Sequence, residues 1–256
     1  MGKIVAFIGP PGSGKTSLAM KAAVETYCAT KSNRIFFVSP DICVPSCGVI
    51  FPNYAPDDLA SIGGIFDSTD IDFDTVLNSG VSVKSMKDFA CYGFKSGENR
   101  ATYPAPDENI LRDLFEVMRR NTSYVFVDCS DDGKDTISEQ ALKMADIIIR
   151  VIPADLKGMT WYATNRHLYG PDEKCFINVV NPGGKGLFYP TDEVCTKVGG
   201  VLTVMPYSKA LAQQMLDGSL YERLKDPGFN KALKTLVKRI FEMEDQNAVS
   251  DFSQRV

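Results

Sequence analysis

The stretch KIVAFIGPPGSGKTSLAM, residues 3–20, decides the fold of this chain. It begins with a short apolar run rich in β-branched residues and ends with an amphipathic run of Ala, Leu and Met. Between these runs, residues 9–16 satisfy the pattern G-x-x-x-x-G-K-[ST] at every fixed position. The stretch therefore predicts a buried strand, a phosphate-binding loop and a helix, in that order.

The residue types of this loop suit the binding of a phosphate chain. Glycines let backbone N–H groups surround an oxyanion, and the following helix offers unpaired N–H donors at the positive end of its dipole. Lys15 supplies a mobile charge for the outer phosphates, and the Thr16 hydroxyl can ligate Mg²⁺. The residues expected around the phosphates are Gly9, Pro11, Gly12, Ser13, Gly14, Lys15, Thr16 and Ser17.

Apolar strands alternate with amphipathic helices along the rest of the chain. Strands are predicted over residues 34–38, 123–128, 146–152, 174–180 and 201–204, with a weaker signal over 89–94. Helices are predicted over residues 14–29, 106–120, 137–144, 159–168, 208–215 and 230–243. This alternation predicts one doubly wound, mainly parallel α/β sheet. We expect a single domain over residues 1–244, followed by a polar tail over residues 245–256.

The signal is weakest over residues 43–105. Residues 57–66 and 73–77 have helix-like apolar spacing, and residues 85–90 are compatible with a helical turn. Tyr92, Phe94, Arg100 and Tyr103 indicate either a partner surface or ordinary aromatic packing under a surface excursion. Packing is the better supported interpretation.

Two aspartates that follow predicted strands are candidates for chemistry at a nucleotide. Asp128 closes the apolar run YVFVD, which has the form of a Walker B strand whose carboxylate orients Mg²⁺, usually through a water molecule. Asp41 follows the run RIFFV and could position Mg²⁺ or the attacking water, although Pro40-Asp41 is also a common turn pair. Asp131 and Asp132 would add negative charge where a triphosphate must sit, unless Mg²⁺ is bound or they point outward.

The composition argues against several classes of protein. A net charge of −4 gives no sign of a broad nucleic-acid-binding surface, although a local basic patch is compatible with it. No apolar run is long enough to span a membrane, and Met1 leads directly into the first strand, so we expect a cytoplasmic protein. The seven cysteines lack paired zinc spacing and predict reduced thiols rather than a metal site.

The order of these motifs resembles the MinD/ParA family of P-loop ATPases, including the CpaE/TadZ-type members that act at pilus or secretion sites. The resemblance rests on GPPGSGKTS, Asp41, YVFVDCSDDG, DIIIRVIPADLKGMTW, NVVNPGG and VLTVMPYSKALAQQMLDGSLYE. It implies a SIMIBI-like, three-layer α/β/α P-loop NTPase. It also implies slow Mg²⁺-dependent hydrolysis of ATP to ADP with Lys15, Asp41 and Asp128 as catalytic residues, a nucleotide-dependent homodimer and a further protein partner.

The resemblance also assigns residues around the base, and two positions depart from it. Asn181 matches an asparagine that contacts the base, and Pro206 and Tyr207 match the segment that borders the adenine. Pro10 stands where family members carry a second lysine that reaches the partner's nucleotide, and Ser39 stands where many have an aspartate. Because proline carries no charge, we expect slow hydrolysis or activation by a partner.

Two alternatives compete with a switch ATPase that positions division, partition, pilus or secretion machinery. A small-molecule or nucleoside kinase shares the loop, but the arginines that a lid would need are scattered along the sequence. A non-catalytic nucleotide-binding scaffold would agree with Pro10 and Ser39. The basic amphipathic pattern of residues 231–241 suits a membrane surface, but the polar residues that follow favour a helix packed on the sheet.

Overall fold

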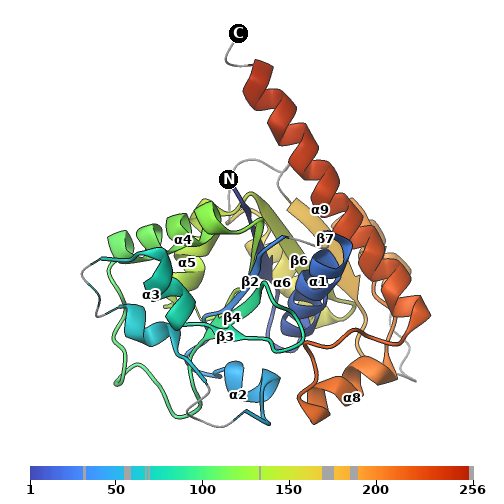
Figure 1. Cartoon of the computed structure of the whole chain (residues 1–256). Coiled ribbons are helices and arrows are strands. Elements are labelled where there is room, and N and C mark those ends of the chain that lie inside the picture. The colour runs from blue at the N-terminus through green and yellow to red at the C-terminus, as the bar shows by residue number, and fades with distance from the viewer. Residues whose placement is uncertain are drawn as a thin grey trace.

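A mainly parallel sheet lies at the centre of the molecule, with helices on both faces (Figure 1). The computed structural model describes residues 1–30, 33–54, 59–66, 68, 70–132, 134–168, 176–184 and 190–253, with side chains as far as residue 243. In this part of the chain the strand order is β3-β4-β2-β5-β1-β6-β7-β8, and only β3 runs antiparallel to its neighbour. The strands are β1 (Lys3–Ile8), β2 (Ile35–Ser39), β3 (Val81–Ser82), β4 (Phe89–Gly93), β5 (Tyr124–Asp128), β6 (Ile147–Pro153), β7 (Phe176–Asn181) and β8 (Val201–Val204).

Helices connect the parallel strands and form the two outer layers. They are α1 (Lys15–Thr30), α2 (Cys47–Ile50), the 3₁₀ helix η2 (Ile62–Ile65), α3 (Phe73–Asn78), α4 (Glu108–Asn121), α5 (Thr136–Met144), α6 (Leu156–Asn165), α7 (Thr191–Val198), α8 (Lys209–Asp217) and α9 (Pro227–Ser253). The predicted fold class, a doubly wound α/β/α arrangement, is confirmed.

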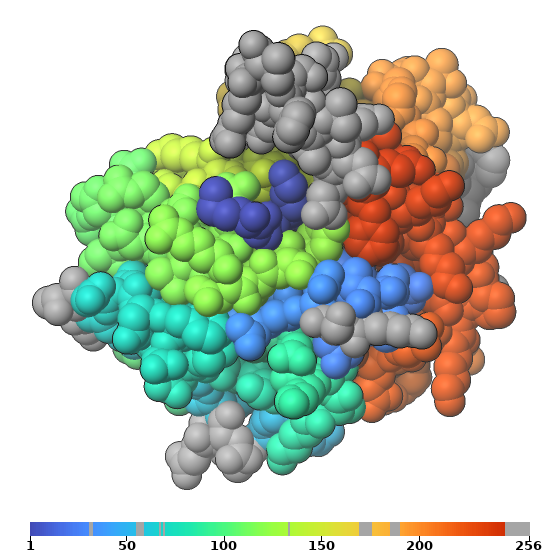
Figure 2. All heavy atoms as spheres, turned by 45° about the horizontal axis from the view of Figure 1, so that its top comes forward, coloured from blue at the N-terminus to red at the C-terminus, as the bar shows by residue number. Residues whose placement is uncertain are grey.

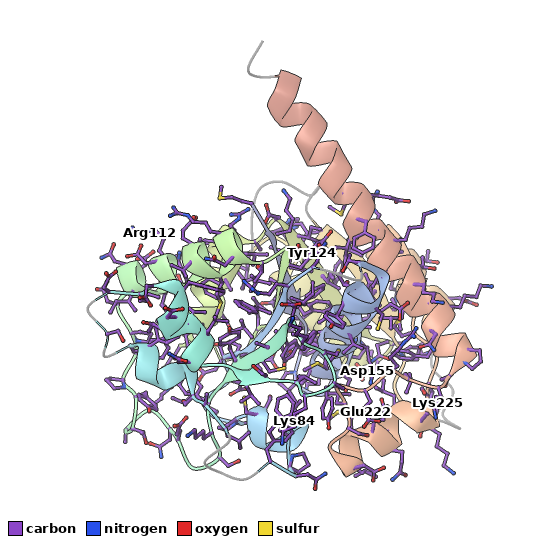
Figure 3. The ribbon with its side chains drawn as sticks, viewed as in Figure 1. Lys84, Arg112, Tyr124, Asp155, Glu222 and Lys225 are labelled. Atoms are coloured by element: carbon purple, nitrogen blue, oxygen red, sulfur yellow. The ribbon has the colours of Figure 1, made fainter. Side chains whose placement is uncertain are left out.

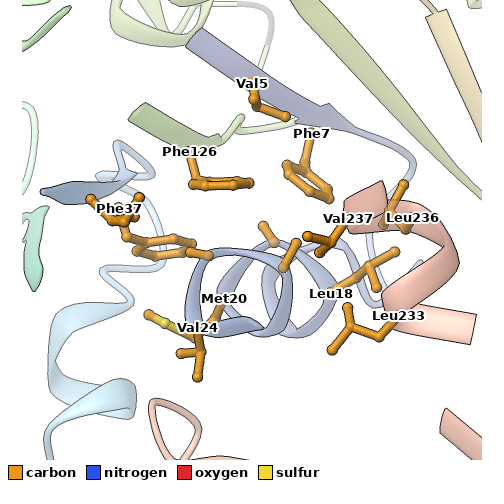
Figure 4. Packing of buried hydrophobic residues seen from close by; sticks show 14 of the residues in the cluster. Val5, Phe7, Leu18, Met20, Val24, Phe37, Phe126, Leu233, Leu236 and Val237 are labelled. Atoms are coloured by element: carbon orange, nitrogen blue, oxygen red, sulfur yellow. The ribbon is translucent and has the colours of Figure 1, made fainter. Parts of the chain in front are cut away.

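The central strand β1 sends alternate side chains to opposite faces of the sheet, as the two-residue period of a strand requires. Val5 and Phe7 pack with α1 and α9, as Figure 4 shows from close by. Ile4 and Ala6 pack on the other face with α4 and α5. Burial on both faces explains why the sequence of β1 is a continuous apolar run rather than an alternating one.

Several boundaries differ from the prediction. Helix α9 begins at Pro227 and its backbone stays helical to Ser253, so most of the predicted tail continues the closing helix. Helix α6 begins at Leu156, because Asp155 caps it by accepting a hydrogen bond from Gly158 N. Elements α2, α7 and β3 are not predicted at all.

The aromatic residues singled out within residues 43–105 pack in or against the sheet. Tyr92 and Phe94 are buried, and the ring of Tyr103 lies 6.0 Å from that of Phe94. The three aromatic residues therefore pack as predicted, whereas Arg100 is exposed and pairs with Asp132. Residues 57 and 58 of the predicted helix lie outside the described residues, and only Ile62–Ile65 are helical there, as a 3₁₀ turn. The predicted turn of helix over residues 85–90 is wrong, because Phe89 already begins β4.

The amino terminus lies on the side of the molecule where the parallel strands begin. Gly2 N donates to Arg119 O over 2.9 Å, and the first residues lie among those that end α4 and begin β5 (Figure 2). The carboxyl ends of β1, β2, β5, β6 and β7 therefore meet at the opposite edge, where open α/β sheets place their ligands. Among the described residues, no helix has both the length and the apolar character needed to cross a membrane.

Candidate functional site

The phosphate loop, residues 9–16, joins β1 to α1 at the carboxyl edge of the sheet (Figure 1). Two of its glycines hold backbone conformations that other residues rarely adopt, with φ of 78° at Gly12 and 82° at Gly14. Gly9 is required for a different reason, since a Cβ there would lie 2.4 Å from the carbonyl oxygen of Val151. The backbone itself thus requires glycine at all three positions.

Asn181, the last residue of β7, touches the phosphate loop directly. Its Nδ2 donates to Ser13 O over 2.7 Å, and a Cβ on Gly14 would lie 2.5 Å from the same nitrogen. The resemblance assigns Asn181 to the base, and the structure adds a contact with the loop. Asn181 therefore fixes the loop to the end of β7, while its role toward a base stays a prediction.

Lys15 forms an ion pair with Asp131, which lies in the loop that follows β5. The distance from Lys15 Nζ to Asp131 Oδ1 is 3.0 Å. Burial raises the pKa of Asp131, and the nearby charge of Lys15 lowers it. Of the two orientations that the sequence left open, Asp131 takes the inward one, against the cation expected to meet the outer phosphates.

Asp132, the next residue, points away from Lys15. Its carboxylate pairs with Arg100 from the segment after β4 and accepts a hydrogen bond from Lys134 N over 3.0 Å. Cys43 Sγ lies 3.5 Å from the same carboxylate. Asp132 thus contacts the segments that follow β2, β4 and β5.

Asp128 ends β5 beside Thr16 and is almost completely buried, at 4% exposure. Burial raises its pKa to about 6, against hydrogen bonding from Thr16 and the charge of Lys15, which lower it. Ser39 Oγ lies 3.5 Å from Asp128 Oδ2, so Ser39, at the position where the resemblance leads one to expect an aspartate, is a donor to Asp128. Asp128 Oδ1 has no hydrogen-bond partner among the described residues.

The unpartnered oxygen of Asp128 and the adjacent Thr16 hydroxyl fit a Mg²⁺ ion. Magnesium prefers oxygen ligands and keeps several waters, and is commonly held by one or two protein groups together with substrate phosphates. In the described part of the chain, no group of three or more His, Cys, Asp or Glu side chains could hold a metal ion. A Mg²⁺ at Thr16 and Asp128 would therefore depend on phosphate oxygens and water for the rest of its ligands.

Asp41 lies close to this centre but is also part of a turn. Its Oδ1 accepts hydrogen bonds from Cys43 N and Val44 N, over 2.9 and 3.0 Å. Its charge contributes to raising the pKa of Asp128 and of Asp131. The structure therefore places Asp41 beside the site and in a turn at once, and leaves Oδ2 as the atom available to a water molecule or Mg²⁺.

A cavity of about 220 Å³ lies on the other side of the loop, where the resemblance places the base, and it is called the base end below. Pro206 and Tyr207 line it from the segment after β8, and Asn181 lines it from β7. Helix α8 contributes Leu211 and Met215, and Ser17 Oγ lies 3.2 Å from Met215 Sδ. The residues that the resemblance assigns to the adenine are thus brought together around one largely apolar cavity.

Lys21 was not singled out by the sequence, and its side chain links α1 to α8 and to the segment between α8 and α9. It is 1% exposed and donates to Gln214 Oε1, to Leu220 O over 2.7 Å and to Glu222 O over 2.6 Å. Glu222 is labelled in that segment in Figure 3. Burial lowers the pKa of Lys21 to about 7. A lysine inside the apolar run LAMKAAV was the available signal.

A larger cavity, of about 850 Å³, opens on the opposite side of the phosphate loop from the base end. Its polar lining includes Asp131, Asp135 and Ser138, and its apolar lining includes Trp161 and Leu142. Burial raises the pKa of Asp135 to about 6. This cavity has room for a second molecule next to the loop.

The fold and the loop together define the class: the chain has the fold of the MinD/ParA-type P-loop ATPases. A ParA family ATPase from Chlorobium tepidum superposes with a TM-score of 0.74 at 13% identity, over 93% of this chain and 99% of that one. The septum site-determining protein MinD from Pyrococcus horikoshii, complexed with Mg-ADP, gives 0.70 at 13% identity, over 94% and 96%.

A third similar structure is a putative plasmid partition protein from Borrelia burgdorferi bound to AMPPNP. It gives a TM-score of 0.68 at 14% identity, over 95% of this chain and 100% of that one. Identities this low establish a shared fold alone. No protein-family model and no curated protein matches the sequence.

Proposed function

We propose that this protein binds ATP with Mg²⁺ and hydrolyses it slowly, as a MinD/ParA-like switch that positions or regulates a partner assembly. The proposal rests mainly on one observation: the structure brings Lys15, Thr16, Asp128 and Asn181 together at the glycine-rich phosphate loop. Solved proteins of the same fold hold AMPPNP or Mg-ADP, which supports an adenine nucleotide as the ligand.

Each end of the site has a distinct part in this proposal. Lys15 and the loop N–H groups bind the outer phosphates, and the cavity beside Tyr207 and Met215 receives the base. Thr16 and Asp128 are the residues that would hold Mg²⁺, and a bound Mg²⁺ would supply positive charge to the phosphates. Asp41 Oδ2 orients the attacking water.

The proposal includes a homodimer that forms when ATP is bound. Leu156, at the first turn of α6, is 88% exposed. It precedes Lys157, whose Nζ reaches the phosphate loop, so an apolar side chain lies on the surface beside the nucleotide. A single exposed apolar residue is ordinary on a protein surface, so the dimer is proposed from the resemblance to the family, with Leu156 as a residue that a partner would cover.

Two measurements test the proposal. Calorimetric titration with ATP should show binding in Mg²⁺ and much weaker binding in EDTA. Light scattering with ADP and with a non-hydrolysable ATP analogue should give a monomer with the first and a dimer with the second. A protein that binds neither nucleotide would refute the proposed site, and one that binds ATP but stays monomeric would refute the switch.

The cavity of about 850 Å³ favours a second candidate function, transfer of the terminal phosphoryl group to a small molecule. It is lined by Pro11 of the loop and by Asp131 and Asp135, so an acceptor hydroxyl bound there would lie beside the outer phosphates. Incubation with ATP and a panel of acceptors separates the two candidates, since a kinase gives a phosphorylated product and a switch gives inorganic phosphate.

A further inference from the structure

The phosphate loop of this chain carries one lysine, and the position after its first glycine is a buried proline. Pro10 offers neither charge nor an N–H group, so Lys15 is the only cation that residues 9–16 themselves provide. A triphosphate brings several negative charges to the loop, and transition-state stabilisation in this class of chemistry comes mainly from positive charge around the transferred group. The loop alone is therefore short of positive charge.

A second cation reaches the loop from α6. Lys157 Nζ donates to Pro11 O over 3.3 Å. A lysine in the first turn of a helix is unfavourable with respect to the helix dipole, which prefers acidic residues there. An anion beside Lys157 would offset this cost, and the helix alone does not explain the residue.

The first turn of α6 is held in place from two sides. Asp155, labelled in Figure 3, accepts a hydrogen bond from Gly158 N over 2.6 Å. A Cβ on Gly158 would lie 2.2 Å from Pro153 O, so only glycine allows the turn to approach the end of β6 this closely. This close approach sets the base of the Lys157 side chain next to the loop.

The Asp131 carboxylate is an anion that interacts electrostatically with both Lys15 and Lys157. Its Oδ1 lies 3.0 Å from Lys15 Nζ. Burial raises the pKa of Asp131, while Lys15 and, more weakly, Lys157 lower it. The Asp131 carboxylate therefore occupies a position that Lys15 contacts directly and Lys157 stabilises at longer range.

We infer that Lys157 binds the terminal phosphate of ATP within its own chain, together with Lys15, and supplies the positive charge that the loop lacks at Pro10. The inference rests on the proposed function, and it adds a specific residue to it. The terminal phosphate takes the place of the Asp131 carboxylate against Lys15, and Asp131 turns away. Arg100 is less suited to binding the terminal phosphate, because its side chain pairs with Asp132 of the same loop.

The test compares ATP with ADP, because only ATP carries the terminal phosphate. Affinities for both nucleotides are measured by calorimetry in Mg²⁺ for the natural protein, Lys157→Gln and Lys157→Arg. Lys197→Gln is the matched control, since it removes one exposed lysine from the last turn of α7, which lies at the opposite edge of the sheet. A hydrogen bond to a charged group contributes enough to change the affinity about tenfold.

We expect Lys157→Gln to lower ATP affinity about tenfold and to leave ADP affinity within about twofold. Lys157→Arg should retain most of the ATP affinity, and Lys197→Gln should match the natural protein for both nucleotides. An equal loss for ATP and ADP, or no loss, would overturn the inference while leaving the proposed function intact.

Two further outcomes distinguish the inference from its alternatives. If the natural protein binds neither ATP nor ADP, the proposed function fails and the inference fails with it. If the loss of ATP affinity in Lys157→Gln appears only at protein concentrations at which light scattering detects a dimer, Lys157 acts on the partner's nucleotide. That result would overturn the assignment to the same chain.

Discussion

The phosphate end and the base end of the site lie on opposite sides of one loop and are built from different chemistry. At the phosphate end, the charges of Asp131 and Asp41 help to raise the pKa of Asp128, and the charge of Asp41 helps to raise that of Asp131. The base end is lined mainly by apolar groups such as Leu211 and Met215. The phosphate end thus depends on cations to balance its carboxylates, whereas the base end depends on shape.

The largest expected effect comes from removing Lys15, the cation on which the phosphate end depends. Lys15→Ala should weaken ATP binding by at least about a hundredfold, because the outer phosphates lose a charged hydrogen-bonding partner and the negative charge of Asp131 beside them is no longer balanced. Calorimetric titration with ATP in the presence of Mg²⁺ measures the affinity, and Lys197→Ala is the control. Unchanged affinity in Lys15→Ala would mean that phosphates bind elsewhere.

The next expected effect tests whether the burial of Asp128, beside other carboxylates, lowers folding stability. Asp128 has a pKa of about 6 in the folded protein against an ordinary value of 3.8, so the folded state holds the proton more tightly. Folding stability therefore falls as pH rises from about 4 to about 6, and the difference corresponds to about 3 kcal/mol. Asp128→Asn does not titrate, and its oxygen can still accept from Thr16.

Urea unfolding without nucleotide or Mg²⁺ checks this expectation. Asp128→Asn should be more stable than the natural protein by about 3 kcal/mol at pH 7.5 and equal to it below about pH 4. Asp135, whose pKa burial also raises to about 6, titrates in both proteins and cancels in the comparison. A constant difference at all pH values would show that Asp128 is not the titrating group.

The smallest expected effect comes from a substitution at the base end, which should leave binding at the phosphate end unchanged. Tyr207→Ala should weaken ATP and ADP about equally, by about tenfold at most, because it removes contact with the base and leaves the phosphates untouched. Binding of inorganic tripolyphosphate should not change. Leu216→Ala is the matched control, since Leu216 is 81% exposed on α8, which follows Tyr207 in the chain, and does not line the cavity. A weaker affinity for tripolyphosphate in Tyr207→Ala would contradict the division into two ends.

The sequence predicted those elements of the fold whose residues are adjacent in the chain and form a clear local pattern. The strand, loop and helix of residues 3–20 are adjacent in the chain, so their residue types specify them directly. The buried strands were also predicted, because burial on both faces produces uninterrupted apolar runs. In contrast, β3 has only two residues, and α7 is eight residues long, too short for a clear periodic signal.

The side-chain partners of the site could not be predicted in this way. The sequence left open whether Asp131 points toward the phosphates, and the answer depends on how the loop after β5 lies against α1. The contacts of Lys21 with the α8–α9 segment and of Lys157 with Pro11 join residues that are far apart in the chain. Such contacts follow from strand order and helix packing, which a local pattern does not contain.

The central position of β1 has a consequence for how the chain is made. Its neighbours are β5 and β6, so Val5 pairs with Phe126 on one side and Ile147 on the other. At about 5–20 residues per second, a ribosome adds those partners many seconds after β1 has emerged. The phosphate loop is thus synthesised well before the strands that flank β1, and nucleotide can stabilise the loop only after β5 and β6 have been made.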